Sequence, residues 1–517
     1  MRLGDALERT VRCYPDKLAL VTDDGRSFTY AELDERSTRL ANALTERVGT
    51  ERCAVLAINH VSAIEAMLAG NKRGVATAQL SYRATVGELE RMSETAAAEA
   101  LLFDDANADD ALELLDRGAF DVAIHAGDRD VDHENVESYE AVLAGADTDL
   151  DASLPAGDEC AVLYTSGTTS VPKAVSFDQE KLWYGAIQVI MEHGIDETDV
   201  ALCTSPWYHM VTTDAWLYPH FVAGATVVLH SAFDPEEALE LIDDHDVTGL
   251  LAVPTQLKSL NGIQREGGEP YDTDSLSYIR TGGSIVTDDL IEETHEYLSE
   301  HVYNTYGMTE AGPDLTFAHP EVQEEHPGTI GKESFSWEIR VVESVSLAED
   351  PDPEATVDAG ERGEIIARGP GMSDGYIDNP DADEKTYFDG WLRTRDVARV
   401  DEEGYLYIVD RVDNMIVSGG ENVYPAEVER VLGNHPDVEE ACVFGRDDDQ
   451  WGEVVTAVVV VAEGADVSDE DLDQYCLQHD SLADFKRPRE YAITHDALPR
   501  TDTGTIMREQ LVEKHFS

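Results

Sequence analysis

The feature that most constrains this sequence is a repeated alternation of short apolar runs with amphipathic helical segments. In one such unit, residues 226–229 and 249–253 have the composition of buried strands, and residues 235–243 between them have helical periodicity. Residues 53–58 and 63–69 repeat the pattern. Since a strand, a helix and a second strand form a parallel pair in one sheet, the alternation predicts an α/β fold with helices covering parallel sheets.

The pattern of apolar and turn-forming residues changes after about residue 360. Short strand-like runs with glycine turns follow, which predicts a small β-barrel-like subdomain. After Arg411 the pattern is that of a compact α+β unit. We therefore predict a large N-terminal domain of parallel-sheet subdomains at 1–412 and a small mobile α+β domain at 413–517, in keeping with the length of 517 residues. Residues 104–151 are acid-rich and weakly periodic, and we expect surface loops there.

The composition is strongly acidic, with 107 Asp and Glu against 37 Lys and Arg and a formal net charge of −70. The acidic residues lie among normal apolar patterns, so they do not form one disordered tail. This distribution is typical of a cytoplasmic protein of a salt-loving organism. It excludes nucleic acid and anionic membrane as expected partners, because both are polyanions.

Cysteine usage and targeting signals favour a cytoplasmic protein with no membrane span. Six scattered cysteines show no zinc-like spacing and are expected to be reduced, mostly buried thiols. Residues 1–5 lack the apolar stretch of a signal peptide. No apolar run approaches the ~20 residues that span a bilayer. The sequence does not indicate an oligomeric state.

A hydroxyl- and glycine-rich segment, residues 164–175, lies between two apolar strand-like runs. Backbone N–H groups and hydroxyls in such a loop can bind phosphate, and Lys173 adds a positive charge. The segment lacks the GxxxxGK[ST] pattern, so it is not a Walker A loop. Taken alone, it could equally be an ordinary polar hairpin turn.

Three further segments carry chemically suited side chains. In residues 303–310, Tyr306 can stack on a base, and Thr309 with Glu310 can supply oxygen ligands to Mg²⁺. Residues 391–396 end in Asp396, whose carboxylate suits two ribose hydroxyls. Residues 419–425 form a glycine turn that leads into a helix.

These four segments, in this order and spacing, resemble the adenylate-forming family of acyl- and aryl-CoA synthetases, luciferases and adenylation domains. The resemblance runs from about Phe28 to about Leu511. The last hundred residues resemble the 4-chlorobenzoate–CoA ligase branch, on the strings at 411–423, 450–452 and 482–488. The resemblance implies that a carboxylate attacks the α-phosphorus of Mg·ATP to give an acyl-adenylate and pyrophosphate. The C-terminal domain then rotates, and the CoA thiol displaces AMP.

The resemblance also implies a role for individual residues. His209 matches a histidine that lines the acyl site, although a lone histidine among aromatic residues is more often a core residue. Asp413 matches the hinge. The implied binding sets are Thr165, Ser166, Gly167, Thr168, Thr169, Lys173, Tyr306, Asp396 and Arg411 for ATP; Thr309 and Glu310 for phosphate and metal; Trp183, Tyr184, His209, Gly282, Gly283 and Met308 for the acyl group; and Gly419, Gly420, Trp451, Phe485, Arg487 and Arg489 for CoA.

The sequence departs from the family pattern at one catalytic position. Thr505 stands where the family has a lysine that bridges the carboxylate and the α-phosphate. A neutral hydroxyl cannot supply that charge, and loss of one preorganised donor commonly costs about 10²–10³ in rate. Smaller departures are Ser170, Ala174, Arg395 and Asp410, each in place of a glycine.

We therefore predict an AMP-forming carboxylate–CoA ligase, with Mg²⁺ as cofactor, ATP and CoA as substrates, and adenylation slowed by Thr505. The alternative is a ligase-like protein that binds nucleotide or acyl-adenylate and performs only the thioester-forming half-reaction. An adenylation domain that serves a carrier protein is disfavoured by the basic cluster at 485–489. The identity of the acid is not readable from residues spread over several loops.

The net charge of −70 predicts that folding requires salt. The Debye length falls from roughly 10 Å at 0.1 M to roughly 3 Å at 1 M, which screens repulsion between the carboxylates. Thermal melts at rising KCl should therefore shift to higher temperature. A melting temperature that does not respond to KCl would contradict this prediction and the inferred habitat.

Overall fold

The computed structural model describes residues 2–49, 51–165, 172–267, 270–284, 286–312, 314–345, 349–419, 421–448, 451–462, 464–465, 467–479, 482–500 and 506–516. The chain forms two compact units. Unit 1 comprises residues 1–338 and 367–392, and unit 2 comprises residues 339–366 and 393–517. The chain passes between the units within three strands, β17, β18 and β20. The predicted domain boundary at 412/413 stays a prediction, because the division into compact units does not identify the residue about which a domain rotates.

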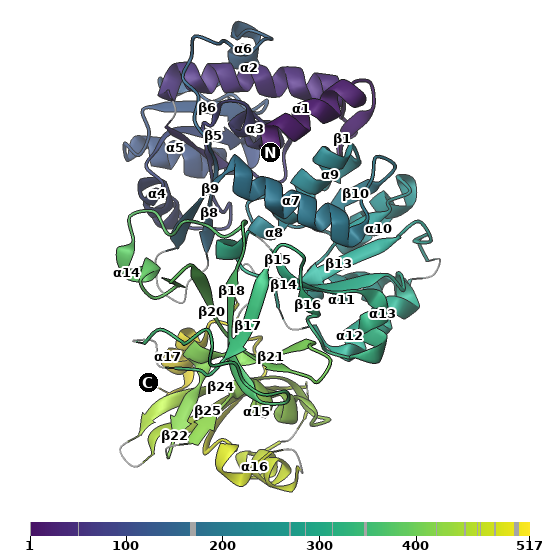
Figure 1. Cartoon of the computed structure of the whole chain (residues 1–517), viewed down its shortest axis with the longest axis vertical. Coiled ribbons are helices and arrows are strands. Elements are labelled where there is room, and N and C mark those ends of the chain that lie inside the picture. The colour runs from purple at the N-terminus through teal and green to yellow at the C-terminus, as the bar shows by residue number, and fades with distance from the viewer. Residues whose placement is uncertain are drawn as a thin grey trace. The chain divides into compact units, whose positions relative to one another are not determined.

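The first sheet of unit 1 has nine strands in the order β16-β15-β14-β13-β12-β10-β11-β1-β2 (Figure 1). Neighbours from β1 through β14 are parallel, whereas β2, β15 and β16 add antiparallel edges. The strands are β1 (Leu18–Thr22), β2 (Ser27–Thr29), β10 (Val200–Cys203), β11 (Thr226–Leu229), β12 (Gly249–Leu251), β13 (Tyr278–Gly282), β14 (Val302–Gly307), β15 (Asp314–Ala318) and β16 (Lys332–Glu333).

The second sheet of unit 1 has seven strands in the order β7-β6-β5-β3-β4-β8-β9. It is parallel except for the last pair, β8 and β9, which are antiparallel neighbours. The strands are β3 (Arg52–Leu56), β4 (Thr77–Gln79), β5 (Ala98–Asp104), β6 (Val122–Ala126), β7 (Val136–Ser138), β8 (Glu159–Thr165) and β9 (Lys173–Asp178).

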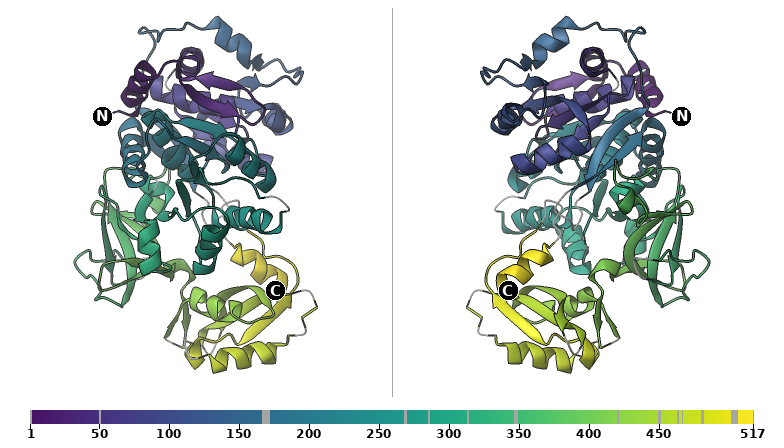
Figure 2. Two further views of the ribbon diagram at one scale, coloured as in Figure 1. Left: turned by 90° about the vertical axis from the view of Figure 1, so that its right-hand side faces the viewer. Right: turned by 90° about the vertical axis from the view of Figure 1, so that its left-hand side faces the viewer.

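Helices cover the two sheets of unit 1, as the views in Figure 2 show. Their ends carry the expected local signals: Thr29 and Glu32 form a capping box at the start of α2, and Asp234 caps α10 ahead of Pro235. The helices are α1 (Leu3–Cys13), α2 (Tyr30–Val48), α3 (Val61–Arg73), α4 (Val86–Thr95), α5 (Ala108–Asp116), α6 (Tyr139–Gly145), α7 (Gln179–His193), α8 (Met210–Thr212), α9 (Tyr218–Ala223), α10 (Pro235–Asp244), α11 (Pro254–Glu266), α12 (Asp288–Tyr297), α13 (Pro320–Glu325) and α14 (Pro380–Asp383). A π-helical turn, η2 (Thr213–Leu217), joins α8 to α9.

Two smaller sheets complete the chain. The first has five strands: β17 (Glu338–Val342), β18 (Arg362–Arg368), β19 (Tyr387–Phe388), β20 (Trp391–Val400) and β21 (Leu406–Arg411). The second lies in unit 2 and consists of β22 (Ile416–Ser418), β23 (Glu421–Val423), β24 (Val438–Asp448), β25 (Gly452–Val461) and β26 (Glu490–Thr494). Helices α15 (Pro425–Gly433), α16 (Asp469–Gln478) and α17 (Arg508–Phe516) belong to the same unit.

The βαβ expectation is confirmed, and so is the change to short strands after residue 360. The expectation for residues 104–151 was incomplete, because the segment holds α5, β6, β7 and α6 as well as loops. Its strand β6 is only five residues long and lies inside the seven-stranded sheet, so the acidic flanks hide it from a periodicity search. Among the described residues, no helix combines the length and apolar character needed to cross a bilayer. All six cysteines are free, and only Cys13 is exposed.

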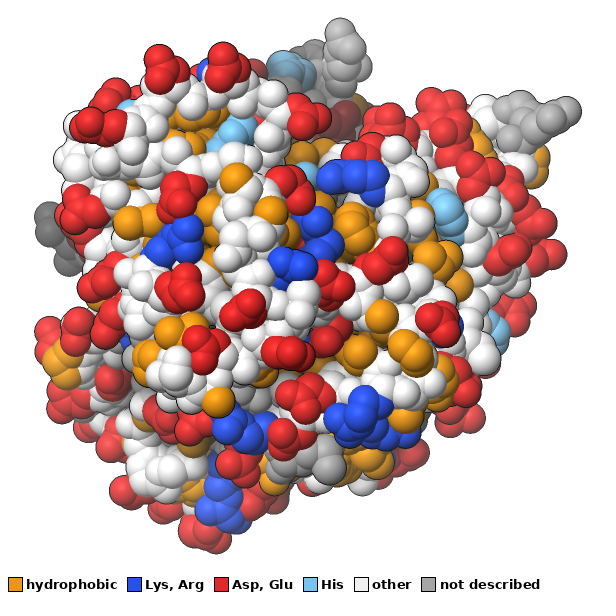
Figure 3. Space-filling view, turned by 90° about the horizontal axis from the view of Figure 1, so that it is seen from above, with side chains coloured by type: hydrophobic (Ala, Val, Ile, Leu, Met, Phe, Trp, Pro, Cys, Tyr) orange, Lys and Arg blue, Asp and Glu red, His pale blue; other side chains and the backbone are white. Residues whose placement is uncertain are grey.

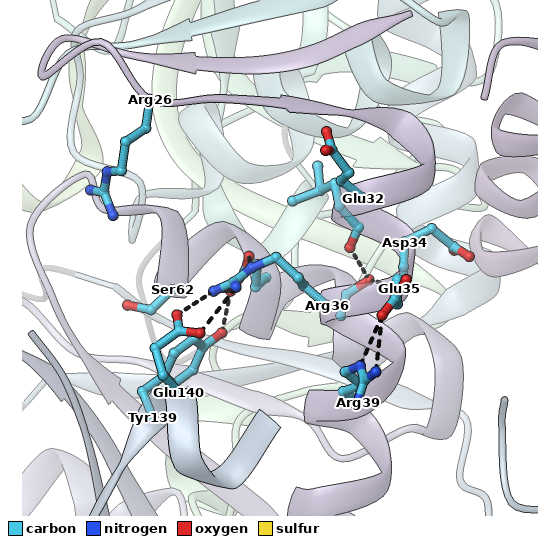
Figure 4. Close-up of polar contacts among 12 residues, drawn as sticks. Arg26, Glu32, Asp34, Glu35, Arg36, Arg39, Ser62, Tyr139 and Glu140 are labelled. Atoms are coloured by element: carbon cyan, nitrogen blue, oxygen red, sulfur yellow. Dashed lines mark hydrogen bonds and ion pairs between the residues drawn. The ribbon is translucent and has the colours of Figure 1, made fainter. Parts of the chain in front are cut away.

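On the face shown in Figure 3, carboxylates outnumber Arg and Lys side chains. In unit 1, one of these arginines satisfies a buried carboxylate. Glu65 of α3 is fully buried, and its carboxylate accepts hydrogen bonds from Arg36 of α2 and from the Tyr139 hydroxyl of α6. Arg36 also pairs with Glu140 at 2.7 Å (Figure 4). Burial raises the pKa of Glu65, and the charge of Arg36 opposes that rise.

Removing Arg36 should destabilise unit 1 strongly, since a buried ion pair that loses one partner leaves an uncompensated charge. Arg36→Met is expected to lower the free energy of unfolding by about 3–5 kcal/mol in urea titrations at fixed KCl. The double variant Arg36→Met/Glu65→Gln should recover much of that loss. Arg117→Met, which breaks exposed pairs with Glu90 and Glu113, is the control and should cost about 1 kcal/mol or less. Equal losses for the two single variants would contradict the account.

Candidate functional site

Two residues that flank the hydroxyl-rich loop face each other across a hairpin. Thr165 ends β8, Lys173 begins β9, and the two are register partners in an antiparallel pair. The Lys173 ammonium lies 4.8 Å from the centroid of the Tyr376 ring. The loop predictions Ser166, Gly167, Thr168 and Thr169 lie outside the described residues. The hairpin thus brings one hydroxyl and one cation together at the ends of the loop.

The segment after β14 holds the predicted base-stacking and metal-binding side chains. Tyr306 lies near the end of β14, and Thr309 and Glu310 form a 3₁₀ turn directly after it. Glu310 is buried, and its carboxylate accepts a hydrogen bond from the Tyr376 hydroxyl. Burial, with the nearby Glu310 charge, raises the pKa of Tyr376, so that hydroxyl stays protonated and donates.

The oxygen atoms of Thr309 and Glu310 fit a magnesium ion. Mg²⁺ prefers hard oxygen ligands and is commonly held by one or two carboxylates together with substrate phosphates. Among the described residues, no group of three or more His, Cys, Asp or Glu side chains is arranged to hold a metal ion.

Asp396 and Arg411 are register partners on β20 and β21 of unit 2, and Arg411 Nη1 lies 3.2 Å from Asp396 Oδ1. Asp413 follows in a 3₁₀ turn and pairs with Arg395 at 3.2 Å and with Arg411 at 3.8 Å. Arg395 has a φ of 63°, a left-handed conformation that glycine adopts more readily. Arg395, which replaces a glycine of the family pattern, thus keeps a glycine-like backbone conformation, and its side chain forms an ion pair with Asp413.

The predicted acyl-site residues lie on or beside four elements of unit 1, namely α7, α8, β13 and β14. Trp183 and Tyr184 are half-buried on α7. His209 directly precedes α8, and its Nε2 atom is shielded from solvent without a partner among the described residues. Burial lowers the pKa of His209 to about 4, so the imidazole is neutral at pH 7. Gly282 has a φ of 156°, and a Cβ there would lie 2.3 Å from the Thr305 carbonyl oxygen, so only glycine fits. Gly283 and Met308 lie at the adjoining strand ends.

The predicted CoA residues lie in unit 2. The Gly419 amide donates to the Trp451 carbonyl at 2.7 Å, and a Cβ on Gly419 would approach the indole to 3.0 Å. Trp451 and Phe485 are exposed, which suits contact with a ligand. Arg487 is paired with Asp473 at 2.7 Å, and Arg489, two residues later, is exposed. Gly420 lies outside the described residues.

Thr505 also lies outside the described residues. The two arginines near it in sequence already have carboxylate partners: Arg500 pairs with Glu440, and Arg508 pairs with Glu429 at 3.1 Å. Both guanidinium groups are therefore already engaged by carboxylates.

Sequence reasoning noted Asp410 only as a departure from glycine and missed its contacts. Its carboxylate accepts from the amide of Ala426 at 2.8 Å, from the Arg411 amide at 2.7 Å and from the Asn414 side chain at 3.0 Å. Asp410 therefore caps the first turn of α15 from outside that helix, since no side-chain cap comes from Tyr424. No local sequence signal indicates this cap, because 16 residues separate donor and acceptor. The buried ion pair between Arg280 and Asp314, which joins residues 34 positions apart, was missed for the same reason.

Matches to protein families and curated proteins cover most of the chain. The profile described as "AMP-binding enzyme" matches residues 7–377, and that described as "AMP-binding enzyme C-terminal domain" matches residues 427–505. The chain is 34% identical to a feruloyl-CoA synthase of Amycolatopsis over 527 aligned positions, covering 98% of each protein.

Solved structures are similar over the same extent. The o-succinylbenzoate CoA synthetase of Bacillus subtilis, in complex with its acyl-adenylate intermediate, has a TM-score of 0.82 and 30% identity, covering 98% of this chain and 97% of that one. The same synthetase with ATP and a magnesium ion has a TM-score of 0.81 at 30% identity, covering 98% of each chain.

Asp410→Ala should loosen the start of α15, because the Ala426 amide loses its acceptor. We expect a loss of about 1–2 kcal/mol in the free energy of unfolding and faster hydrogen exchange at the Ala426 amide. Asp437→Ala replaces an exposed carboxylate in the same unit and should change stability by about 0.5 kcal/mol or less. Unchanged exchange at Ala426 would show that the cap is unimportant.

Proposed function

We propose a reaction for this chain from one premise: it belongs to the AMP-binding enzyme family. The reaction is the AMP-forming ligation of a carboxylic acid to CoA, with ATP converted to AMP and pyrophosphate. The observation that carries the proposal is that unit 1 places the Thr165–Lys173 hairpin and the Tyr306–Glu310 segment at strand ends, with side chains suited to phosphate, base and metal. Residues 7–377 match the family over that same region.

In the adenylation half-reaction, residues of unit 1 bind and orient ATP. Thr165 and Lys173, with Ser166, Gly167, Thr168 and Thr169, hold the β- and γ-phosphates by hydroxyl, amide and ammonium donors. Tyr306 faces the adenine ring. Thr309 and Glu310 would hold Mg²⁺, which supplies positive charge to the phosphates when it is bound. The hydroxyl of Tyr376 fixes the orientation of the Glu310 carboxylate.

The carboxylic acid lies beside His209, between α7 and the end of β13. A neutral His209 can donate a hydrogen bond without adding a second charge next to the carboxylate, in keeping with its lowered pKa. Trp183, Tyr184, Gly282, Gly283 and Met308 line this site. Because similar proteins are a feruloyl-CoA synthase and an o-succinylbenzoate CoA synthetase, we place the substrate among acids with an aromatic ring.

The second half-reaction uses residues of unit 2. Asp396 and Arg411 hold the ribose, and Asp413 is the hinge at the boundary of domains 1–412 and 413–517. Gly419, Gly420 and Trp451 bind the pantetheine arm, while Phe485, Arg487 and Arg489 bind the nucleotide part of CoA. Arg487 must leave or share Asp473 to do so. A cytoplasmic location and a salt-rich habitat remain part of the proposal.

A second candidate is favoured by Thr505. Without a lysine at that position, the chain would form acyl-adenylate slowly and act mainly in the thioester-forming half-reaction. The two candidates differ only in the rate of pyrophosphate release.

A panel of aromatic acids scored by CoA-dependent AMP release tests the proposed function, and Thr505→Lys tests the role of residue 505. The lysine variant should raise the single-turnover rate of pyrophosphate release by about 10²-fold. Thioester formation from supplied acyl-adenylate should stay within about twofold and serves as the internal control, because the missing charge acts only in adenylation. No AMP from any acid with either protein would overturn the proposed function. Equal pyrophosphate release from both proteins would show that another group supplies the charge.

A further inference from the structure

Asp214 carries a deeply buried carboxyl group. It lies in the π-helical turn η2 and is fully buried. Neither of its carboxyl oxygens has a hydrogen-bond partner within the part of the chain that the structure describes. A buried polar group without a partner costs about 1–3 kcal/mol. Such a group therefore calls for a reason other than stability of the unliganded fold.

Gly185 of α7 leaves space for the Asp214 carboxyl group. A Cβ on Gly185 would lie 2.2 Å from Asp214 Oδ2 and 2.8 Å from its Cγ, so the glycine lets the carboxyl group pack directly against the helix backbone. The residue before Gly185 is Tyr184, which belongs to the predicted acyl site. The carboxyl group thus contacts the helix that lines that site.

A neighbouring cation does not neutralise Asp214. Arg280 is fully buried on β13, and its Nη2 donates to both carboxylate oxygens of Asp314 at 2.5 and 2.6 Å. Its Nη1 donates to the carbonyl of Ala215, the residue after Asp214, at 2.7 Å. Arg280 therefore lies near two buried carboxyl groups but forms its ion pair with Asp314. Burial and the Asp314 charge raise the pKa of Asp214 well above its ordinary value, which favours its neutral form.

The elements around Asp214 are those that carry the predicted acyl site. Asp214 follows His209 by a single helical stretch, α8 and η2, and Arg280 precedes Gly282 on β13. In Figure 1, α7, α8 and the strands β13 to β15 lie together in unit 1. Asp214 accordingly lies next to elements that carry the residues proposed to line the acyl site.

We propose that Asp214 determines substrate specificity by accepting a hydrogen bond from the far end of the acid, so that the substrate is an aromatic carboxylic acid with a hydrogen-bond donor remote from its carboxylate. This inference rests on the proposed function and adds the class of acid. The Arg280–Asp314 pair is a positioning element that fixes the backbone on which Asp214 stands. A site with a buried hydrogen-bonding group rejects an analogue that lacks the matching group, because the group is then left unpaired.

Matched acids test the inference. Cinnamate, 4-hydroxycinnamate, 4-methoxycinnamate and 4-(aminomethyl)cinnamate have similar shapes, but only the second and the fourth carry a donor at the far end. We expect kcat/KM for the preferred donor acid to exceed those of cinnamate and 4-methoxycinnamate by about 10²-fold or more. Asp214→Asn retains a carbonyl acceptor but cannot ionise. It should keep the preference for a hydroxyl and lose a preference for an ammonium group, which separates the two donor chemistries.

Asp214→Ala removes the acceptor and should abolish the preference among the four acids. Thermal melts establish that each variant is folded, and calorimetric binding of the four acids without ATP gives a readout independent of turnover. A donor preference that survives Asp214→Ala, or its absence from the unaltered chain, would overturn the inference. Donor-selective binding without AMP formation would sink the proposed function and leave the inference standing. AMP formation from all four acids at equal rates would overturn the inference and leave the proposed function standing. If the acids do not bind and no AMP forms, both the inference and the proposed function are overturned.

Discussion

The buried ion pair between Arg280 and Asp314 is the interaction on which the site of unit 1 depends. The two residues lie on β13 and β15, and β14 lies between those strands in the sheet. The pair therefore spans β14, the strand that carries Tyr306 and leads into Thr309 and Glu310. Breaking one side of a buried pair costs about 3–5 kcal/mol. Here Arg280 Nη2 donates to both oxygens of the Asp314 carboxylate, so each charge has its counter-ion. We infer that this pair holds the strand end in one position.

Scarce basic residues are used mainly inside the protein or against carboxylates. Besides Arg280, Arg393 of unit 2 is buried and pairs with Glu364 at 2.7 Å, and Arg36 satisfies the buried Glu65. Even in the proposed CoA site, Arg487 is paired with Asp473. With so many cations committed to carboxylates, the surface retains a large excess of negative charge. A phosphate-bearing substrate must therefore compete with carboxylates for the arginines that bind it.

Features encoded within short stretches of sequence could be predicted. The βαβ alternation, the strands around residues 161–177 and the helix that begins at Pro425 follow from local periodicity and capping signals, and the structure has all of them. The family resemblance also emerged from four local motifs, which the family match supports. The strands within 104–151 were harder, because β6 is short and its neighbours are acidic.

Features that join distant residues could not be predicted. The 34 residues between Arg280 and Asp314, and the packing of Asp214 against Gly185, have no periodic or compositional signature. The same holds for Asp410, which caps a helix that begins 15 residues later in the chain. These contacts depend on which strands and helices become neighbours, so they become visible only once the topology is known.

The central claim is that this chain activates a carboxylate as an acyl-adenylate. Isotope transfer tests it most directly. An aromatic acid that supports AMP release is labelled with ¹⁸O in its carboxylate and incubated with ATP, CoA and the protein. The ¹⁸O content of each product is then measured by mass spectrometry. Attack of the carboxylate on the α-phosphorus predicts that one labelled oxygen appears in AMP and that pyrophosphate stays unlabelled. Label in inorganic phosphate or pyrophosphate, or thioester formation with unlabelled AMP, would contradict the claim.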